Sequence, residues 1–358
     1  MNILQVCAYA APYPGNFINS LLSLDNELKK NGHQTIYAFC DSARNKSWCV
    51  ELQKTKKVYF LPLRRARINP TTYFLMRQII RCEKIDIAHS HFGLYDLPLA
   101  MIAPKSCRVF WHLHDPLERG KSFITDFLTK LQFSHFGKEA ILLSVCDYYR
   151  NTAVDLGMKK ENTRTIVNGI DLQRITYPYK KAKKEFDFLT FGWDFHRKGA
   201  DIIFSAMNQL YRDGYRFKLL FNCLESTLEQ VKLYFNRDIP VWLEIGKPVD
   251  DINHLFENSK MFIQASRSET FSYAVCEAAY AGLDVICSDI IGMEWAHSVP
   301  SVTFFESENI KQLYALLKKR LDNEQIIANN TIQTTRKIIV GNFSTHVWVR
   351  HIISEYGI

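Results

Sequence analysis

The stretch Ser266-Arg-Ser-Glu-Thr-Phe-Ser-Tyr-Ala-Val-Cys-Glu-Ala-Ala-Tyr-Ala-Gly282 decides the fold of this 358-residue chain. The apolar run 261–265 precedes it and predicts a buried strand, and a polar turn then leads into a helix of small apolar residues. A helix that is apolar nearly all round is buried, so a carboxylate within it needs a partner. We therefore expect Glu277 to be buried rather than exposed.

The turn at the start of this helix is a candidate binding site. We expect the backbone N–H groups of Thr270, Phe271 and Ser272 to lie at the helix N-terminus. The first N–H groups of a helix have no partner within it, and the helix dipole favours negative charge there. An anion or sugar hydroxyls would satisfy them. Glu269 comes directly before these residues, and seven residues separate it from Glu277.

Strands and helices alternate outward from this stretch to both ends of the chain. The predicted strands are 3–7, 34–40, 58–61, 86–90, 109–112, 140–144, 165–167, 188–192, 218–222, 241–245, 261–265, 285–287 and 302–304. The predicted helices are 17–31, 72–82, 123–136, 147–156, 199–211, 228–235, 251–256, 310–322 and 343–358. Such alternation argues for parallel sheets covered on both faces, and the length suits two domains. The sequence therefore predicts an α/β fold of two doubly wound, Rossmann-like domains.

The division between these domains is predicted at a turn. Asn168-Gly169-Ile170-Asp171 is a turn signal that follows a short strand. We expect one domain over residues 1–170 and a second over 171–342. The tail 343–358 is apolar enough to pack as a further helix.

Two loops that follow strands carry candidate ligand-binding residues. Arg197 and Lys198 stand before Gly199, between a predicted strand and a predicted helix. The guanidinium fork and the ammonium group suit a diphosphate. Gly15 and Asn16 follow the first strand of the chain, where a doubly wound fold presents its loop to a ligand.

Four histidines lie near the ends of two predicted strands, in the runs His89-Ser-His91 and His112-Leu-His114. Because side chains alternate along a strand, each pair lies on one face of the sheet. Three interpretations remain open: structural hydrogen bonding, a metal site, or contact of His114 with a ligand. No cysteine or carboxylate cluster completes a metal-ligand set, so we expect no bound metal.

The net charge of +8 belongs to the first half of the chain. Residues 1–171 carry 23 Lys and Arg against 15 Asp and Glu, and the remainder is balanced. Basic residues of the segment 54–84 alternate with aromatic and aliphatic ones, which suits an anionic membrane face. Nucleic acid is the competing partner, and a solvated face without a partner is the third alternative.

The compartment is predicted from the cysteines and from the apolar runs. Nine cysteines are scattered without a Cys-x-x-Cys pair, which favours reduced thiols in a cytoplasmic chain. No basic region precedes the first apolar run, so a secretory signal is not expected. No apolar stretch reaches about 18 residues, so we expect any membrane contact to be peripheral.

Together these motifs resemble the family-4 retaining glycosyltransferases of the GT-B fold, in which two Rossmann-like domains face a cleft. The resemblance covers essentially the whole chain. It rests first on the Glu-x7-Glu element, formed by Glu269 and Glu277, and on the basic pair Arg197 and Lys198. The inter-domain turn at 168–171 and the N-terminal Pro-x-x-Gly region at 12–15 also match, as does His114, a histidine that ends a central strand. The family more often has Gly-Phe-Gly where this chain has Thr270-Phe271-Ser272.

The resemblance implies a role for each matching residue. Arg197 and Lys198 would hold the donor diphosphate, and His114 would contact the transferred sugar from the N-terminal domain. The phosphate and sugar would contact the donor loops at Gly15, Asn16, Thr270, Phe271 and Ser272. Glu269 would bind sugar hydroxyls and Glu277 the ribose, while Ile245, Gly246 and Lys247 would lie at the nucleotide base. The C-terminal helix 343–358 would pack back on the N-terminal domain.

The implied activity is retaining transfer of a hexose-type sugar from a nucleotide-diphosphate sugar. The N-terminal domain would bind the acceptor, a glycan or lipid-linked glycan of cell-surface polysaccharide synthesis, and the C-terminal domain the donor. The resemblance implies neither a metal nor a cofactor besides the donor substrate, and no nucleic acid partner. The alternatives are a nucleotide-sugar epimerase and a non-catalytic, glycosyltransferase-like partner of an active enzyme.

Overall fold

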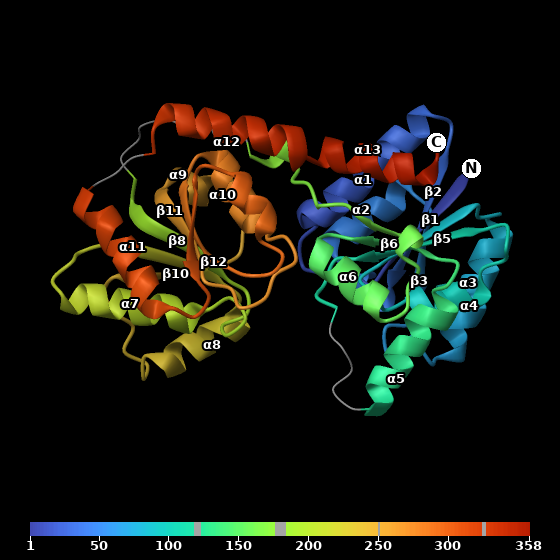
Figure 1. Cartoon of the computed structure of the whole chain (residues 1–358), viewed down its shortest axis with the longest axis horizontal. Helices are drawn as coiled ribbons and strands as arrows, with labels where there is room; N and C mark the ends of the chain where they lie inside the picture. Colours follow the sequence, from blue (N-terminus) through green and yellow to red (C-terminus); the bar gives the residue numbers. More distant parts are fainter. Residues whose placement is uncertain (118–122, 176–183, 250, 324–326) are drawn as a thin grey trace. The chain divides into compact units, whose positions relative to one another are not determined.

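The computed structural model describes residues 1–117, 123–175, 184–249, 251–323 and 327–358 (Figure 1). The chain forms two compact units. Unit 1 comprises Met1–Gly169 together with Thr345–Ile358, and unit 2 comprises Ile170–Ser344. Each unit is built on one parallel sheet, so the predicted α/β class with two Rossmann-like domains is confirmed.

Unit 1 contains a seven-stranded sheet in the order β3-β2-β1-β4-β5-β6-β7. Its strands are β1 (Asn2–Cys7), β2 (Gln34–Cys40), β3 (Val58–Leu61), β4 (Ile87–His91), β5 (Arg108–Leu113), β6 (Ile141–Ser144) and β7 (Thr163–Thr165). Its helices are α1 (Gly15–Lys30), α2 (Ser47–Thr55), α3 (Pro70–Cys82), α4 (Asp96–Ile102), α5 (Phe123–Leu131), α6 (Asp147–Asp155) and α13 (Thr345–Tyr356). All neighbouring strands are parallel.

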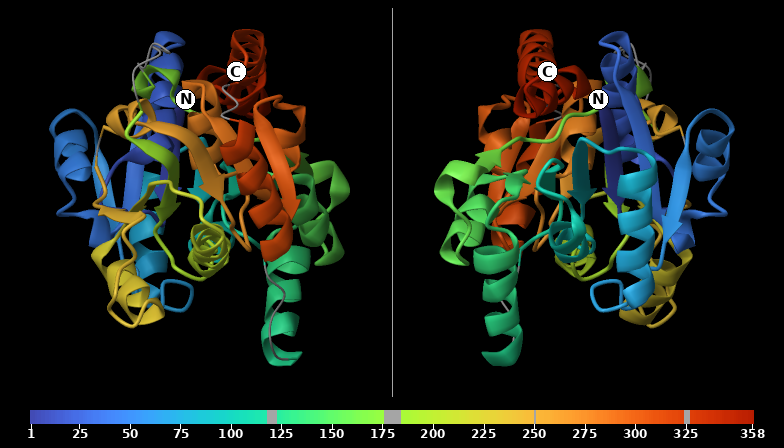
Figure 2. Two further views of the ribbon diagram at one scale, coloured as in Figure 1. Left: turned by 90° about the vertical axis from the view of Figure 1, so that its left-hand side faces the viewer. Right: turned by 90° about the vertical axis from the view of Figure 1, so that its right-hand side faces the viewer.

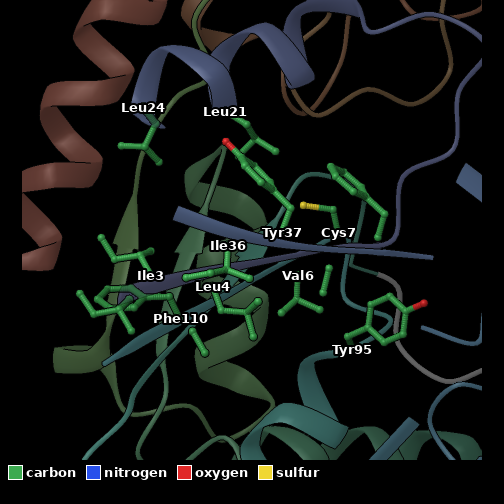
Figure 3. Packing of buried hydrophobic residues seen from close by; sticks show 14 of the residues in the cluster. Ile3, Leu4, Val6, Cys7, Leu21, Leu24, Ile36, Tyr37, Tyr95 and Phe110 are labelled. Carbon is green, nitrogen blue, oxygen red and sulfur yellow. The ribbon is translucent and has the colours of Figure 1, made fainter. Parts of the chain in front are cut away.

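The core of unit 1 covers both faces of its central strands. Leu21 and Leu24 of α1 lie on one side of these strands in Figure 3, and Tyr95 lies on the other. Ile3, Leu4, Val6 and Cys7 of β1 are completely buried. A central parallel strand that is buried on both faces reads as an uninterrupted apolar run, which is the pattern that predicts β1 from the sequence.

The C-terminal helix α13 packs into unit 1, far from its neighbours in sequence. Trp348 and Ile352 belong to the same buried cluster as β1. Nε2 of Gln5 donates to the Tyr356 hydroxyl at 3.1 Å, and the Arg108 guanidinium donates to the Tyr356 carbonyl at 2.7 Å. These contacts join the last turn of α13 to β1 and to the start of β5.

Unit 2 contains a six-stranded parallel sheet in the order β10-β9-β8-β11-β12-β13. Its strands are β8 (Phe186–Gly192), β9 (Leu219–Cys223), β10 (Leu243–Gly246), β11 (Ser259–Gln264), β12 (Asp284–Asp289) and β13 (Val302–Glu306). Its helices are α7 (Ala200–Arg212), α8 (Glu225–Tyr234), α9 (Asn253–Glu257), α10 (Tyr273–Ala281), α11 (Ile310–Asn323) and α12 (Asn329–Asn342).

Several elements differ from their sequence-based predictions. The strand predicted at 165–167 lies two residues earlier, and the helix predicted at 123–136 changes to a π turn after Leu131. The helices α2, α4 and α12 were not predicted. In α12, Asn, Thr and Ile have low helix propensity, but the helix packs on α10, and Nε of Arg336 donates to the Tyr280 carbonyl at 2.9 Å. Tertiary packing therefore overrides local propensity there.

No helix in the described part of the chain is both long and apolar enough to cross a membrane.

Candidate functional site

The order of the sheet in unit 2 creates one point where ligands bind in doubly wound folds. β8 and β11 are neighbours at the centre, and the chain proceeds outward from them in opposite directions. In such sheets the binding crevice lies at the carboxyl ends of these two strands. The loop after β8 carries Arg197 and Lys198, and the turn after β11 carries Glu269. The strand order therefore brings these predicted site residues to one edge of the sheet.

Two glycines allow these segments to approach one another. Gly199 has a left-handed φ of +66°, and a Cβ there would lie 1.9 Å from the carbonyl oxygen of Ala265. Gly292 has a φ of +87°, and a Cβ there would lie 2.5 Å from the carbonyl oxygen of Glu269. Because only glycine tolerates both the conformation and the space, Gly199 lets the basic loop approach the end of β11, and Gly292 lets the segment after β12 approach the turn at Glu269.

Lys198 and Glu269 form an ion pair that is largely removed from solvent. Nζ of Lys198 donates to Oε1 of Glu269 at 2.5 Å, and the hydroxyl of Ser266 donates to the same oxygen at 2.9 Å. The two side chains are 13% and 8% exposed. The neighbouring Arg197 is exposed, and its backbone N–H donates to Asp194 at 2.8 Å. The basic pair is thus divided into one anchored cation and one exposed cation.

Arg267 ties the loop to the turn, and no role for it was predicted. Its guanidinium donates to both carboxylate oxygens of Asp201 in α7, at 2.9 and 2.8 Å, and to the carbonyl oxygen of His196 at 2.5 Å. Its backbone N–H donates to the carbonyl oxygen of Arg197 at 2.8 Å. Such a bidentate pair has a fixed geometry, so Arg267 holds the loop of Arg197 and Lys198 beside the turn that leads into α10.

The predicted helix N-terminus is present, with Ser272 as the residue before the first turn of α10. Ser272 has a left-handed φ of 57°, which few residues other than glycine adopt. Its hydroxyl donates to Oε1 of Gln264 at 2.7 Å. Nε1 of Trp295 donates to the Phe271 carbonyl at 2.6 Å, and the two rings stack at 4.7 Å. These contacts hold the turn although the family's usual glycine is missing.

Glu277 is buried in α10, as the sequence predicted. Oε1 of Glu277 accepts a hydrogen bond from the Arg174 guanidinium at 3.1 Å. The carbonyl of Arg174 in turn accepts from Nδ2 of Asn253 at 2.8 Å. The sequence required a partner for this carboxylate but offered no signal for Arg174, because the two residues are 103 positions apart.

The residues expected near a nucleotide base lie at the same edge of the sheet. Ile245 and Gly246 end β10, and Lys247 follows. Nδ2 of Asn222, at the carboxyl end of β9, donates to the Lys247 carbonyl at 2.6 Å. All predicted donor residues of unit 2 therefore belong to segments at the carboxyl ends of its strands or, for Glu277, to the helix that follows.

Gly15, Asn16 and His114 lie in unit 1, at the corresponding point of the other sheet. α1 begins at Gly15, which has a left-handed φ of 56°, and Asn16 is buried in its first turn. The ring of Phe17 packs edge-on against His91 and His114, with centroids 5.2 and 5.3 Å apart. His114 thus lies beside the first turn of α1, near the carboxyl ends of β1, β4 and β5.

The four histidines form one buried cluster that extends to the C-terminal helix. His91 Nδ1 and His114 Nε2 lie 3.0 Å apart in a hydrogen bond, and His91 Nε2 lies 2.8 Å from Oε1 of Gln5. His89 Nδ1 lies 2.6 Å from the Tyr356 hydroxyl. Neither nitrogen of His112 has a hydrogen-bond partner among the described residues. For three of the four residues, the geometry supports a structural hydrogen-bonding role.

Burial keeps these histidines neutral. It lowers the pKa of His89 to about 3, assisted by the nearby His114. It also lowers the pKa of His114 to about 3, although a hydrogen bond with Asn168 opposes the change. Burial likewise holds the pKa values of His91 and His112 well below their usual range.

Within the described residues, His89, His91 and His112 offer ring nitrogens within 4.8 Å of one another, as a metal site would require. However, the rings of His89 and His112 are stacked, with an interplanar angle of 9° and centroids 5.3 Å apart. A metal lies close to the plane of each imidazole that binds it, and two stacked rings do not share a plane. The observed rotamers therefore do not form a ligand set, and the absence of a metal stays a prediction.

Two family models match successive parts of the chain. The model described as Glycosyltransferase Family 4 matches residues 19–174, and the one described as Glycosyl transferases group 1 matches residues 173–338. Their junction lies next to the boundary between units 1 and 2.

Two curated proteins are distant relatives, and both belong to phosphatidylinositol N-acetylglucosaminyltransferases. The chain is 22% identical over 312 residues to a subunit of the human enzyme. It is 22% identical over 305 residues to the gpi3 subunit of the enzyme from Schizosaccharomyces pombe. The alignments cover 82% and 81% of this chain but only 63% and 66% of the relatives, so the chain spans less than two thirds of their length.

Solved structures share the fold over the whole chain. HepE of Anabaena in complex with UDP has a TM-score of 0.80 at 15% identity, with 100% of both chains covered. Sucrose-phosphate synthase from Thermosynechococcus elongatus has a TM-score of 0.79 at 13% identity, covering 99% of this chain and 98% of the other. A glycosyltransferase from Rickettsia africae has a TM-score of 0.77 at 17% identity, with 99% and 97% covered. The two parallel sheets, the family models and these neighbours together identify the chain as a family-4-like glycosyltransferase of the GT-B fold.

Proposed function

We propose that the chain transfers a hexose-type sugar from a nucleotide-diphosphate sugar to a glycan or lipid-linked glycan acceptor, with retention at the anomeric carbon. The transfer would serve cell-surface polysaccharide synthesis at the cytoplasmic face of the membrane. One observation carries the proposal: the Lys198–Glu269 ion pair lies at the switch point of the unit 2 sheet, next to the N-terminus of α10.

The donor class is supported by the chemistry of this edge. An exposed guanidinium, an anchored ammonium and a helix N-terminus all attract phosphate oxygens. Structural neighbours are described in complex with UDP and with UDP-glucose, and the curated relatives are named as parts of N-acetylglucosaminyltransferases. These descriptions favour a nucleotide sugar as the donor.

Arg197 and Lys198 would perform different parts of the leaving-group chemistry. Glu269 holds the side chain of Lys198, so the position of the ammonium group is set before the donor binds. Arg197 is exposed and is available to form a bidentate contact with the departing diphosphate. Together with the α10 N-terminus, they would stabilise the negative charge that develops as the glycosidic bond breaks. We propose that this set replaces a metal ion.

We propose a front-face reaction. A double displacement needs a carboxylate free to attack the anomeric carbon. Oε1 of Glu269 is already bound by Lys198 and Ser266, which makes this carboxylate a weak nucleophile and a good binder of sugar hydroxyls. In the front-face route, the acceptor hydroxyl attacks on the side from which the diphosphate departs. Its proton passes to the departing phosphate oxygen.

His114 would contact the sugar as a neutral group. Burial lowers the pKa of His114 to about 3, so its imidazole is uncharged near neutral pH. The ring already has hydrogen bonds with His91 and Asn168, so a sugar would pack against the ring or replace one of these partners, and a neutral ring cannot supply a proton as an imidazolium would. We therefore assign His114 to positioning of the substrate rather than to acid catalysis.

The two alternative functions are distinguishable from transfer. A non-catalytic partner has no need of charged site residues, whereas Arg197, Lys198, Glu269 and Glu277 are all present here. The curated relatives are themselves named as subunits, so assembly with other chains is part of this alternative. An epimerase would interconvert free nucleotide sugars without any acceptor.

The test is a screen of nucleotide sugars for slow hydrolysis and for transfer, with and without a chelator. Transfer should be insensitive to the chelator. Arg197→Ala and Lys198→Ala should each lower the rate about 10²–10³-fold, as loss of one preorganised donor does. Lys319→Ala, which removes an exposed cation from α11, is the matched control and should retain the wild-type rate.

Glu269→Ala separates the two glutamate roles. It should abolish transfer and leave nucleotide binding largely intact, which isothermal titration with the nucleoside diphosphate would measure. Loss of nucleotide binding in this variant would mean that the roles of Glu269 and Glu277 are reversed. Near-full activity of Arg197→Ala or Lys198→Ala would contradict the proposed site itself.

A further inference from the structure

The helix α5 carries the most exposed apolar face in the described part of unit 1. None of its nine residues is buried. Phe123, Ile124, Phe127 and Leu128 are 88%, 68%, 56% and 55% exposed. We call these four residues the α5 stripe. In both views of Figure 2, α5 extends away from the body of unit 1.

The spacing of the α5 stripe is that of a face built for contact. Positions i, i+1, i+4 and i+5 lie on one side of a helix, and such a side normally faces the core. Here α5 makes its extensive contacts with the turn Gln132–Phe136 that follows it, and the stripe stays open. A contiguous exposed apolar face on a protein surface marks an interaction site.

Basic and apolar side chains lie on the elements next to α5. The turn Gln132–Phe136 also packs against α4, and α4 packs against α3. Met101 of α4 and Phe74 of α3 are both exposed. The Tyr73 hydroxyl, which donates to the Met101 sulfur at 3.7 Å, connects the two helices. Five exposed arginines belong to α3 and to the loop that precedes it: Arg64, Arg65, Arg67, Arg77 and Arg81.

The charge of unit 1 distinguishes between a second copy of the protein and a lipid bilayer as the partner of the α5 stripe. The whole excess of positive charge belongs to residues 1–171, so a second copy of unit 1 would bring like charge against like. An anionic bilayer supplies both an apolar phase for the stripe and phosphates for the arginines. A nine-residue helix is about 13 Å long, too short to span a bilayer but suited to lie in its interface.

We propose that α5 inserts its stripe into the interface of an anionic lipid bilayer, while the arginines of residues 64–81 contact lipid phosphates. This inference deepens the proposed function and rests on it in one respect. A lipid-linked acceptor would reach unit 1 at the membrane surface.

The experiment uses the full chain and flotation with vesicles of phosphatidylcholine alone or mixed with phosphatidylserine. The chain should float with the anionic vesicles at low salt and much less with the neutral ones. The double variant Phe127→Ser/Leu128→Ser should bind at least about tenfold more weakly, since it removes half of the stripe. The matched control Leu233→Ser/Val241→Ser removes two apolar residues of unit 2 that are more exposed, at 65% and 84%, and should bind as the wild type does.

A triple variant separates the charge from the apolar contact. Arg64→Gln/Arg65→Gln/Arg67→Gln should lose the salt-dependent part of binding and keep the part that depends on the α5 stripe. Wild-type protein that fails to float at any salt would overturn the proposal. So would full binding by the α5 double variant, or a dimer in analytical ultracentrifugation that this variant abolishes.

Donor hydrolysis distinguishes failure of this inference from failure of the proposed function. The α5 double variant should hydrolyse the nucleotide sugar at the wild-type rate, because the stripe belongs to unit 1 and the donor residues Arg197, Lys198 and Glu269 belong to unit 2. If the wild-type protein hydrolyses the nucleotide sugar but does not bind the vesicles, only the membrane inference is overturned. Membrane binding without any hydrolysis or transfer overturns the enzymatic proposal and leaves the docking surface standing.

Discussion

Units 1 and 2 share one architecture but differ in the polar groups near the carboxyl ends of their central strands. In unit 1, the groups near the carboxyl ends of the central strands are neutral histidines in a hydrogen-bonded cluster, as in the His91–His114 pair. In unit 2, the corresponding edge contains the ion pairs Lys198–Glu269 and Arg267–Asp201, with Arg174–Glu277 in the adjoining helix. Because both sheets are parallel and doubly wound, the type of sheet does not explain this difference.

Because of this difference, we expect the two units to be destabilised by different changes. A buried neutral histidine lowers the stability of the fold only at acidic pH. Protonation of its ring there would place a positive charge in surroundings without water, which is costly. A buried ion pair tolerates ordinary pH but leaves a costly isolated charge if one partner is removed. Protons should therefore destabilise unit 1 first, and single substitutions at ion pairs should destabilise unit 2.

The largest expected effect is acid destabilisation of unit 1. Burial lowers the pKa of His89 and His114 to about 3, whereas an unfolded histidine titrates near 6.5. Below about pH 6.5 these histidines are protonated in the unfolded state but remain neutral in the folded state. The free energy of unfolding therefore falls as the pH falls towards 3. Each histidine contributes about 1.4 kcal/mol per pH unit. Hydrogen exchange should show β4 and β5 losing protection before β8 and β11.

One carboxyl group acts in the opposite direction. Burial raises the pKa of Asp96 to about 6, so the folded state binds this proton first and gains stability from about pH 6 downward. The histidines outnumber it, so the net effect remains destabilising. His112→Leu removes a histidine without hydrogen-bond partners among the described residues and should flatten the pH dependence. Equal protection of both sheets from about pH 7 to about pH 5 would contradict this prediction.

The second effect concerns the Arg174–Glu277 pair of unit 2. Arg174→Met should lower the free energy of unfolding by about 3–5 kcal/mol, because it removes the guanidinium that pairs with the buried carboxylate of Glu277. Urea denaturation would measure the loss. The double variant Arg174→Met/Glu277→Leu should recover most of this stability. A loss below about 1 kcal/mol, the value of an exposed pair, would show that Glu277 is solvated.

The smallest effect is expected at Ser272, which has a left-handed φ of 57°. Ser272→Gly relieves the backbone strain but removes the hydrogen bond from the hydroxyl to Gln264. Because each contribution is about 1 kcal/mol, the free energy of unfolding should change by less than about 1 kcal/mol. Ser272→Ala keeps the strain and loses the hydrogen bond, so it should be the less stable of the two variants. The reverse order in thermal unfolding would refute this account of the turn.

The sequence predicted the local parts of the site better than the contacts that join them. The buried helix around Glu277 and the helix start at residues 270–272 were both predicted from the local pattern. Arg267 belongs to the same stretch, yet nothing local showed that it would bind Asp201 in a different helix. Lys198 and Glu269 were each proposed as site residues from the resemblance to a family, but their contact across 71 positions was not predicted.

The helix α5 shows the same limit at the surface. Its apolar spacing predicts a helix with one apolar side, and that side exists. Whether another element covers it depends on where the chain places its neighbours, and the observed fold leaves it open. The periodicity of one segment contains no information about the segments that pack against it.

The sequence by itself determined the class of fold, the helix N-terminus before α10, the buried carboxylate of Glu277 and the basic character of the first half. These features depend on residues close together, through apolar periodicity, turn chemistry and composition. Only the tertiary structure decided the strand order, the partners Arg174 and Arg267, and the link of Gln5 to Tyr356 across 351 positions. Such contacts depend on which helices and strands pack together, and packing selects partners by shape and burial across the whole chain rather than by local sequence.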